Sequence, residues 1–209
     1  MKKHKGFTLI ELLVVILIIG ILMAIVIPNY IRFQENARRV SVKANMRVIQ
    51  TALEGWAVAH DGLYPPADDE DIWKAGNVDG IAPYLPGGDP IGEGGSPTAG
   101  NFPTNPYTRR RYNEDDDNRD LAVVKTIGKG ENAIVRSLDQ GCPYAGLDAP
   151  NNVRGAIGIL FYEGQPGDGA TEEYGICGWG RDIGEPMYDP YKDQTSGESG
   201  MLYFALYNN

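Results

Sequence analysis

One carboxylate stands inside a long apolar run near the start of the chain. Residues 7–27 hold a single charged side chain, that of Glu11, among 21 residues. A helix rises about 1.5 Å per residue, so this run spans about 30 Å, the thickness of a bilayer's hydrocarbon core. An ionisable side chain at such a place is unfavourable and by default indicates function. We therefore expect Glu11 to meet a cation; the alternative is that it reaches the membrane surface and has no role.

A second group of carboxylates lies far along the chain, in the run 114–120. Asp115, Asp116, Asp117 and Asp120 offer the hard oxygen ligands that calcium prefers. The run lacks the glycine and the distal glutamate of an EF-hand loop, so we expect a solvated acidic loop, with calcium binding as the alternative. No nucleophile–base pair, phosphate loop or cofactor motif is present in the sequence, and no enzyme is predicted.

The residues around the apolar run set its orientation. Lys2, Lys3 and Lys5 precede it and should hold the N-terminus on the cytoplasmic side. A secretory signal would have a shorter apolar run and a small-x-small cleavage site, whereas this run leads directly into Pro28. We predict a retained membrane helix with the remaining chain outside the cytoplasm.

Two cysteines, Cys142 and Cys177, are the only ones in the chain. Disulfides persist outside the cytoplasm, so we expect these two to form a bridge. Two buried free thiols are the alternative. Without nearby histidines the pair cannot complete a structural zinc site.

Residues 5–13 read Lys-Gly-Phe-Thr-Leu-Ile-Glu-Leu-Leu. They resemble the class III signal and N-methylation motif of type IV pilins and type II secretion pseudopilins. The resemblance implies that a prepilin peptidase cuts between Gly6 and Phe7 and methylates the new amine of Phe7. It also implies that Glu11 pairs with that amine on a neighbouring subunit, so that the pair sets the register of assembly.

Two helix-weakening residues, Gly20 and Pro28, stand where this family carries a glycine and a proline. The resemblance implies that the helix between them can lose regular hydrogen bonding in a filament. Pro28 lacks an N–H and clashes with the preceding turn, so a kink is expected there from the residue alone. Two breakers that a membrane helix simply tolerates are the alternative.

The charge and the hydrophobic pattern change along the chain. Residues 1–60 carry a net charge of +5 and residues 61–209 one of −14, which disfavours nucleic acid as a partner of the head. Apolar residues recur at intervals of three and four, which indicates a helix whose stripe packs on the head. The helix should stop at Asp61-Gly62. The stripe consists of Val42, Met46, Ile49, Leu53, Trp56 and His60.

The resemblance implies an α+β fold in which the long helix covers a small antiparallel sheet, whereas the strand pattern alone predicts only the sheet. Residues 63–120 are rich in turn signals and are predicted to be irregular. Within them, Phe102–Tyr107 resembles the Asn-Pro-aromatic segment that follows the αβ loop of many pilins. The predicted strands, of which the third and fourth should form a hairpin, are Leu121–Thr126, Ala133–Val135, Ala156–Tyr162, Tyr174–Trp179 and Met201–Tyr207.

These features predict a structural subunit of a type IV pilus-like filament. The expected parts are a leader (1–6), a helix (7–62, membrane-spanning over 7–27 and amphipathic over 28–62), an irregular region (63–120) and a sheet head (121–209). The resemblance implies as partners copies of the chain, prepilin peptidase and an inner-membrane platform with its ATPase, and the apolar run adds the lipid bilayer. The predicted location is the inner membrane and then an extracellular or periplasmic filament. A type II secretion pseudopilin and a membrane-anchored binding protein that never polymerises are the alternatives.

Overall fold

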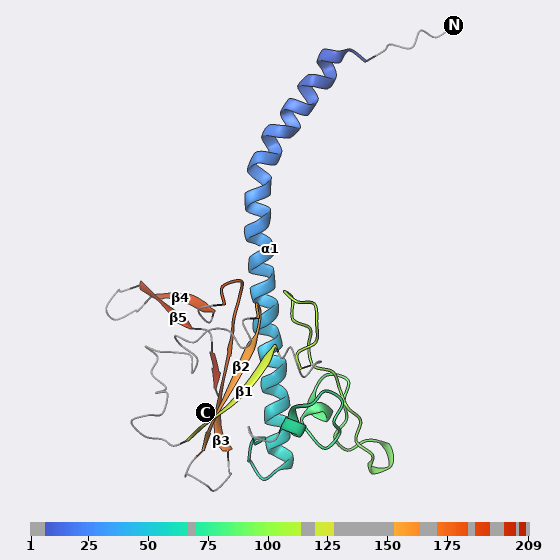
Figure 1. Ribbon diagram of the computed structural model, residues 1–209, viewed down its shortest axis with the longest axis vertical. Coiled ribbons are helices and arrows are strands. Elements are labelled where there is room, and N and C mark those ends of the chain that lie inside the picture. Colours follow the sequence, from blue (N-terminus) through green and yellow to red (C-terminus); the bar gives the residue numbers. More distant parts are fainter. Residues whose placement is uncertain are drawn as a thin grey trace. The chain divides into compact units, whose positions relative to one another are not determined.

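The fold is known from a computed structural model (Figure 1), which describes residues 7–66, 70–113, 120–127, 153–163, 171–183, 187–192, 199–203 and 205–207. The chain divides into two compact units, Met1–Ala37 and Arg38–Asn209. Helix α1 (Leu9–Ala59) belongs to both, and every strand belongs to the second. The predicted α+β class is confirmed.

The first unit presents the apolar part of α1. Its large hydrophobic side chains are exposed, from Phe7 at 78% to Phe33 at 72%. By length and composition α1 could cross a membrane, and none of its most apolar stretch is buried inside the protein. Pro28 lies within α1 and does not end it. The predicted long helix is therefore present, with the bounds Leu9–Ala59 instead of 7–62.

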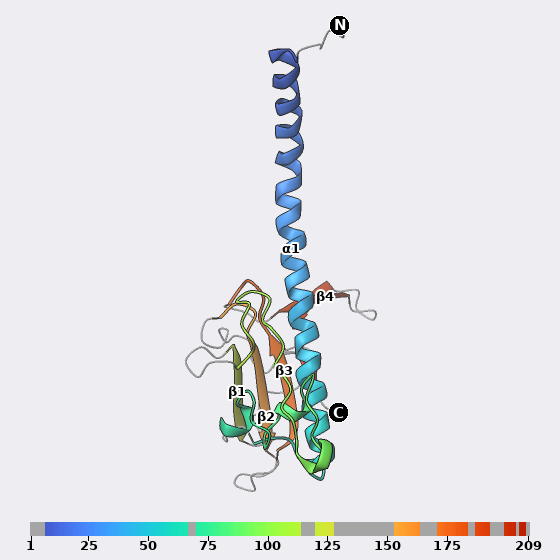
Figure 2. The same ribbon diagram turned by 90° about the vertical axis from the view of Figure 1, so that its right-hand side faces the viewer.

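The second unit is built on the predicted stripe of α1. Val42, Met46, Ile49, Leu53 and Trp56 are all buried, which confirms the helical period read from the sequence. They form one core with the apolar residues of the strands, and Figure 2 shows the sheet lying along this part of the helix. The approach is close, because a side chain on Gly178 would come within 2.8 Å of the Met46 sulfur.

Helix α1 ends close to the predicted stop at Asp61-Gly62. The N–H of Gly62 donates to the carbonyl of Ala57 at 2.8 Å, and Gly62 has a φ of +87°, which glycine adopts without strain. His60, the last member of the stripe, is exposed but stacks on Trp56 with ring centroids 3.9 Å apart. Its Nδ1 lies 2.9 Å from the Trp56 carbonyl oxygen.

The main sheet has the strand order β1-β2-β3-β6. Strands β2 and β3 form the expected antiparallel hairpin, and β6 pairs with β3 in the same manner. The core residues of β2 alternate as Ile157, Ile159 and Phe161, all fully buried. The strands of this sheet are β1 (Leu121–Ile127), β2 (Ile157–Glu163), β3 (Thr171–Gly178) and β6 (Ala205–Tyr207).

Three details of the sheet differ from the prediction. β1 pairs with β2 in parallel, because the chain crosses over between them instead of turning back. The strand predicted over Met201–Tyr207 is two strands in two sheets, β5 (Ser199–Tyr203) and β6. β4 (Tyr188–Lys192), which pairs with β5, was missed because Pro190 argues against a central strand yet is tolerated at an edge. The predicted strand Ala133–Val135 lies outside the described residues.

The irregular region between α1 and β1 is nevertheless well packed. It contains only short 3₁₀ turns, η1 (Glu70–Trp73), η2 (Ala82–Tyr84) and η3 (Glu93–Gly95), in its described part. Several of its side chains still reach the core, so burial is achieved here without regular secondary structure. The buried ones include Trp73, Ile81, Leu85, Phe102 and Tyr112.

Two buried tyrosines, Tyr112 and Tyr174, should make the head sensitive to alkali. Burial raises the pKa of Tyr112, and burial together with a hydrogen bond to Glu54 raises the pKa of Tyr174. A raised pKa in the folded state gives stability that is complete below about pH 10, the pKa of unfolded tyrosine, and is lost as the pH rises. Each tyrosine should then cost about 1.4 kcal/mol per pH unit above that value.

The measurement is urea unfolding of the detergent-solubilised chain, followed by tryptophan fluorescence between pH 8 and pH 11. Tyr112→Phe should reduce the slope of stability against pH above pH 10. An unchanged slope in this variant would show that the phenol of Tyr112 ionises as readily in the folded head as in the unfolded chain.

Candidate functional site

The start of α1 is fixed by Thr8 and Glu11. The backbone N–H of Thr8 donates to the Glu11 carboxylate at 2.8 Å, and the Thr8 hydroxyl donates to the same oxygen at 2.6 Å. In return the N–H of Glu11 lies 3.4 Å from the Thr8 hydroxyl oxygen. This reciprocal arrangement is a capping box, which satisfies N–H groups that the first turn leaves unpaired.

The capping box gives Glu11 a role within its own chain that the sequence analysis missed. The signal was present, since Thr8-Leu9-Ile10-Glu11 has the Thr-x-x-Glu spacing in front of an apolar run. Thr8 donates both of the hydrogen bonds described above to the Glu11 carboxylate, so its oxygens lie near the free end of the helix. The carboxylate therefore lies at the N–H of Thr8, the residue that follows Phe7, where a new amine would form if the leader were removed.

The other predicted residues of this segment are placed as follows. Phe7 is exposed, and Gly6 lies outside the described residues, so the cleavage position stays a prediction. At Gly20 no atom beyond the adjacent residues and the surrounding backbone of α1 lies within 4 Å of where a Cβ would be, and α1 is continuous there. The absent side chain opens a shallow depression of about 510 Å³ on α1, lined by Leu13, Ile16, Leu17, Gly20, Ile21 and Ala24.

The head holds a second polar centre around Asn105 and Asp120, which are both buried. The Asn105 amide donates to the Asp120 carboxylate at 2.7 Å and to the carbonyl of Arg154 at 2.9 Å. The Thr108 hydroxyl donates to the same Asp120 oxygen at 2.7 Å, and the N–H of Tyr107 donates to the Asn105 side-chain oxygen at 2.9 Å. This centre ties the segment 104–108 to the entrance of β1 and of β2.

A glycine is needed beside this centre. Gly155 has a φ of +74°, and a Cβ there would lie 2.4 Å from the Asn105 side-chain oxygen and 2.5 Å from the Tyr107 ring. The Tyr112 hydroxyl donates to the Gly155 carbonyl at 2.6 Å. The Asn-Pro-aromatic segment thus helps to hold the head together. Its Asn105 side chain occupies a space that is open only because residue 155 is glycine.

The predicted metal ligands are not brought together in the described structure. Asp120 takes part in the hydrogen bonds above, while Asp115, Asp116 and Asp117 lie outside the described residues. Among the residues that the structure describes, no group of three His, Cys, Asp or Glu side chains could hold a metal ion. Calcium binding therefore stays a prediction.

Of the two cysteines predicted to form a bridge, the structure describes only Cys177. Cys177 lies in β3, is fully buried and is not a free thiol. Cys142 lies outside the described residues, so its bridge to Cys177 also stays a prediction.

A carboxylate on α1 that the sequence did not single out links the helix to the sheet. Glu54 accepts hydrogen bonds from the hydroxyls of Tyr174, at 2.5 Å, and of Tyr64, at 3.1 Å. The two tyrosine rings meet edge to face with centroids 4.7 Å apart. The contact joins α1 to β3 and to the segment that follows the helix.

Comparisons with known proteins place the N-terminal segment. Residues 1–27 match the family model described as "Prokaryotic N-terminal methylation motif". The chain is 50% identical over 54 residues to the type IV major pilin protein PilA of Myxococcus xanthus, covering 26% of this chain and 24% of that protein. It is 46% identical over 61 residues to the type IV narrow pilus major component PilA5 of Thermus thermophilus, covering 29% and 53%.

A secretion component is similar over the same part of the chain. The type II secretion system core protein G of Klebsiella pneumoniae is 34% identical over 68 residues, which cover 32% of this chain and 48% of that protein. The matches thus span between about a quarter and about half of the length of these relatives. No solved structure matches the chain. In its N-terminal segment, with the methylation motif and the capped apolar helix, the chain is similar to type IV pilins and type II secretion pseudopilins.

Proposed function

We propose that this chain is a structural subunit of a type IV pilus-like filament and has no enzymatic role. The observation that carries the proposal is the single carboxylate, Glu11, held at the free end of an apolar helix by the Thr8 cap. An ionisable group in this position is maintained at a cost in lipid, and a membrane anchor alone would not require it. The methylation motif over residues 1–27 supports the same conclusion.

The proposed sequence of events begins with processing. Prepilin peptidase removes residues 1–6, which leaves the amine of Phe7 close to the Glu11 carboxylate of its own chain. On assembly Glu11 accepts the Phe7 amine of a neighbouring copy, and the buried charge is then offset by a partner of opposite sign. An inner-membrane platform with its ATPase extracts the subunit from the bilayer.

The apolar surface of α1 supports the same proposal. Its exposed side chains contact lipid before assembly and other copies of the helix afterwards, so the transfer exchanges one apolar environment for another. Gly20 and Ala24 leave a depression on α1 that permits a close approach of another helix.

The first experiment examines processing. Membranes from cells that make the full chain are extracted, and the mature N-terminus is determined by mass spectrometry. The expected product starts at Phe7 and carries one added methyl group. A chain that retains Met1–Gly6 would contradict the proposal.

A second candidate, a type II secretion pseudopilin, is favoured by the similarity to core protein G. Electron microscopy of material sheared from the cell surface distinguishes the two roles. Surface filaments made of this chain indicate a pilin. A loss of protein secretion in the deletion strain, without surface filaments in the parent, indicates a pseudopilin.

A further inference from the structure

The charged side chains of the second unit are distributed unevenly along α1. Arg38 lies at the start of this unit, and Ala59 at the end of α1 is about 30 Å away at 1.5 Å per residue. Basic side chains gather at the Arg38 end. Acidic side chains gather at the Ala59 end. The basic end is the exception, because the sequence of the head is acidic overall.

The basic end is made of Arg38, Arg109, Arg110 and Arg154, and the buried asparagine positions three of them. The N–H of Arg109 donates to the backbone carbonyl of Asn105, the N–H of Asn105 donates to the carbonyl of Arg110, both at 2.8 Å, and the Asn105 amide binds the carbonyl of Arg154. Their side chains are exposed.

Arg38 completes the basic end from the helix. Its guanidinium lies over the Tyr107 ring, 5.5 Å from the centroid, which is a cation–π contact. In the described part of the chain, no carboxylate forms an ion pair with any of these four arginines. Within the described residues, these contacts place four arginines together at this end of the unit.

The acidic end is made of Asp61, Asp79, Asp89 and Glu93, all of them exposed. Figure 1 shows the segment that carries them, in cyan and green, around the end of α1 where Ala59 lies. The segment is fixed there, because Tyr84 meets Trp56 edge to face at 5.8 Å and the N–H of Ile81 donates to the carbonyl of Ile72 at 3.0 Å.

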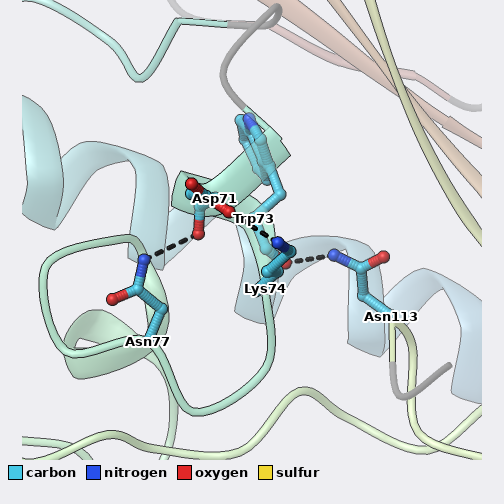
Figure 3. A network of polar contacts seen from close by, with 5 residues as sticks. All are labelled: Asp71, Trp73, Lys74, Asn77 and Asn113. Atoms are coloured by element: carbon cyan, nitrogen blue, oxygen red, sulfur yellow. Dashed lines mark hydrogen bonds and ion pairs between the residues drawn. The ribbon is translucent and has the colours of Figure 1, made fainter. Parts of the chain in front are cut away.

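Asp71 lies on the same segment but is already paired. Lys74 contacts it at 2.5 Å, and this ion pair lowers the pKa of Asp71 (Figure 3). The amides of Asn77 and Asn113 bind the backbone carbonyls of Asp71 and Trp73, which holds the segment in shape. We therefore leave Asp71 out of the acidic end.

We propose that the basic end of one head binds the acidic end of the head of a second copy of this chain. Such a contact joins two different surfaces of the head, so each copy can bind one copy at each end. A contact of this kind gives an open helical polymer when its rotation does not close a ring. Charge complementarity across such a contact also fixes its register and speeds association. The inference rests on the proposed filament function and names the contact between heads within it.

The test is charge reversal in the full chain, expressed with its assembly system. Arg109→Glu together with Arg110→Glu should reduce the yield of sheared filaments about tenfold, because the altered surface repels the acidic end of the next copy. Adding Asp79→Arg and Glu93→Arg to the same chain should restore filaments, since the two ends are then complementary again. Wild-type filaments should fragment more readily in 1 M salt than in 0.05 M salt, where screening is weaker.

Two controls separate the contact from folding and from processing. Arg47→Glu, a reversal of charge at an exposed position of α1 between the two ends, should leave the filament yield unchanged. Immunoblots of membranes and resistance to added protease should show that the arginine variant is processed and folded like the wild type.

The outcomes distinguish this proposal from the filament function itself. A normal filament yield from the arginine variant, or no rescue by the compensating reversals, overturns the contact while wild-type filaments still support the function. Binding to phosphatidylglycerol vesicles that the arginine variant loses, with filaments unaffected, would assign the basic end to a lipid surface and also overturn it. No filaments from the wild type would overturn the function.

Discussion

Glu11→Gln reduces filament assembly to background while the processed chain accumulates in the membrane. Glutamine keeps the size of the side chain and accepts hydrogen bonds from Thr8, so the helix still begins at the same residue. It removes the negative charge that the Phe7 amine of a neighbouring copy would meet. The loss should therefore appear in assembly and not in the level of the chain.

The measurement combines electron microscopy of sheared material with mass spectrometry of the membrane-bound chain. Glu35→Gln is the matched control, because it removes the same charge from the same helix beyond the apolar run, and it should leave filaments intact. Normal filaments from Glu11→Gln would show that the charge is dispensable. They would favour the alternative of a carboxylate that only caps its own helix.

Asn105→Ala should lower the free energy of unfolding of the head by about 3 kcal/mol or more. This is a large effect for the substitution of a single buried residue. The substitution removes three hydrogen bonds made by a fully buried amide. It leaves the buried Asp120 carboxylate with one donor fewer, and the N–H of Tyr107 and the carbonyl of Arg154 without this partner. Buried polar groups that lose their partners account for most of the cost.

Urea unfolding of the full chain in detergent, followed by tryptophan fluorescence, measures this loss. Asn101→Ala is the matched control, because Asn101 is exposed and its side-chain oxygen accepts a hydrogen bond from the exposed Arg111, at 2.7 Å. Its effect should stay within about 0.5 kcal/mol. Equal stabilities for the two variants would mean that the buried network does not hold the head together.

The local features of the chain could be read from the sequence because they depend on neighbours along the chain. The spacing from Val42 to Trp56 identified the buried face of α1, and Asp61-Gly62 identified its end. Glu11 was found by its charge alone, within a run that is apolar by composition. Thr8 could have been found by the same local logic, since a capping box spans only four residues.

The features that the sequence did not reveal join residues far apart in the chain. Asn105, Asp120 and Arg154 meet because β1 and β2 run side by side in parallel, and this pairing has no local signal. Strand β4 was missed because it contains Pro190. Strands β5 and β6 were predicted as one continuous strand.

The amino-acid sequence by itself therefore determined the long apolar helix, its single carboxylate, the buried stripe and the resemblance of the N-terminal segment to pilins. Only the tertiary structure decided which polar groups share a buried centre and where the charges of the head gather. The physical reason is that helical period, caps and apolar length are set within a few turns of chain. The satisfaction of a buried polar group, and the sign of a surface, depend instead on which distant segments the fold brings together.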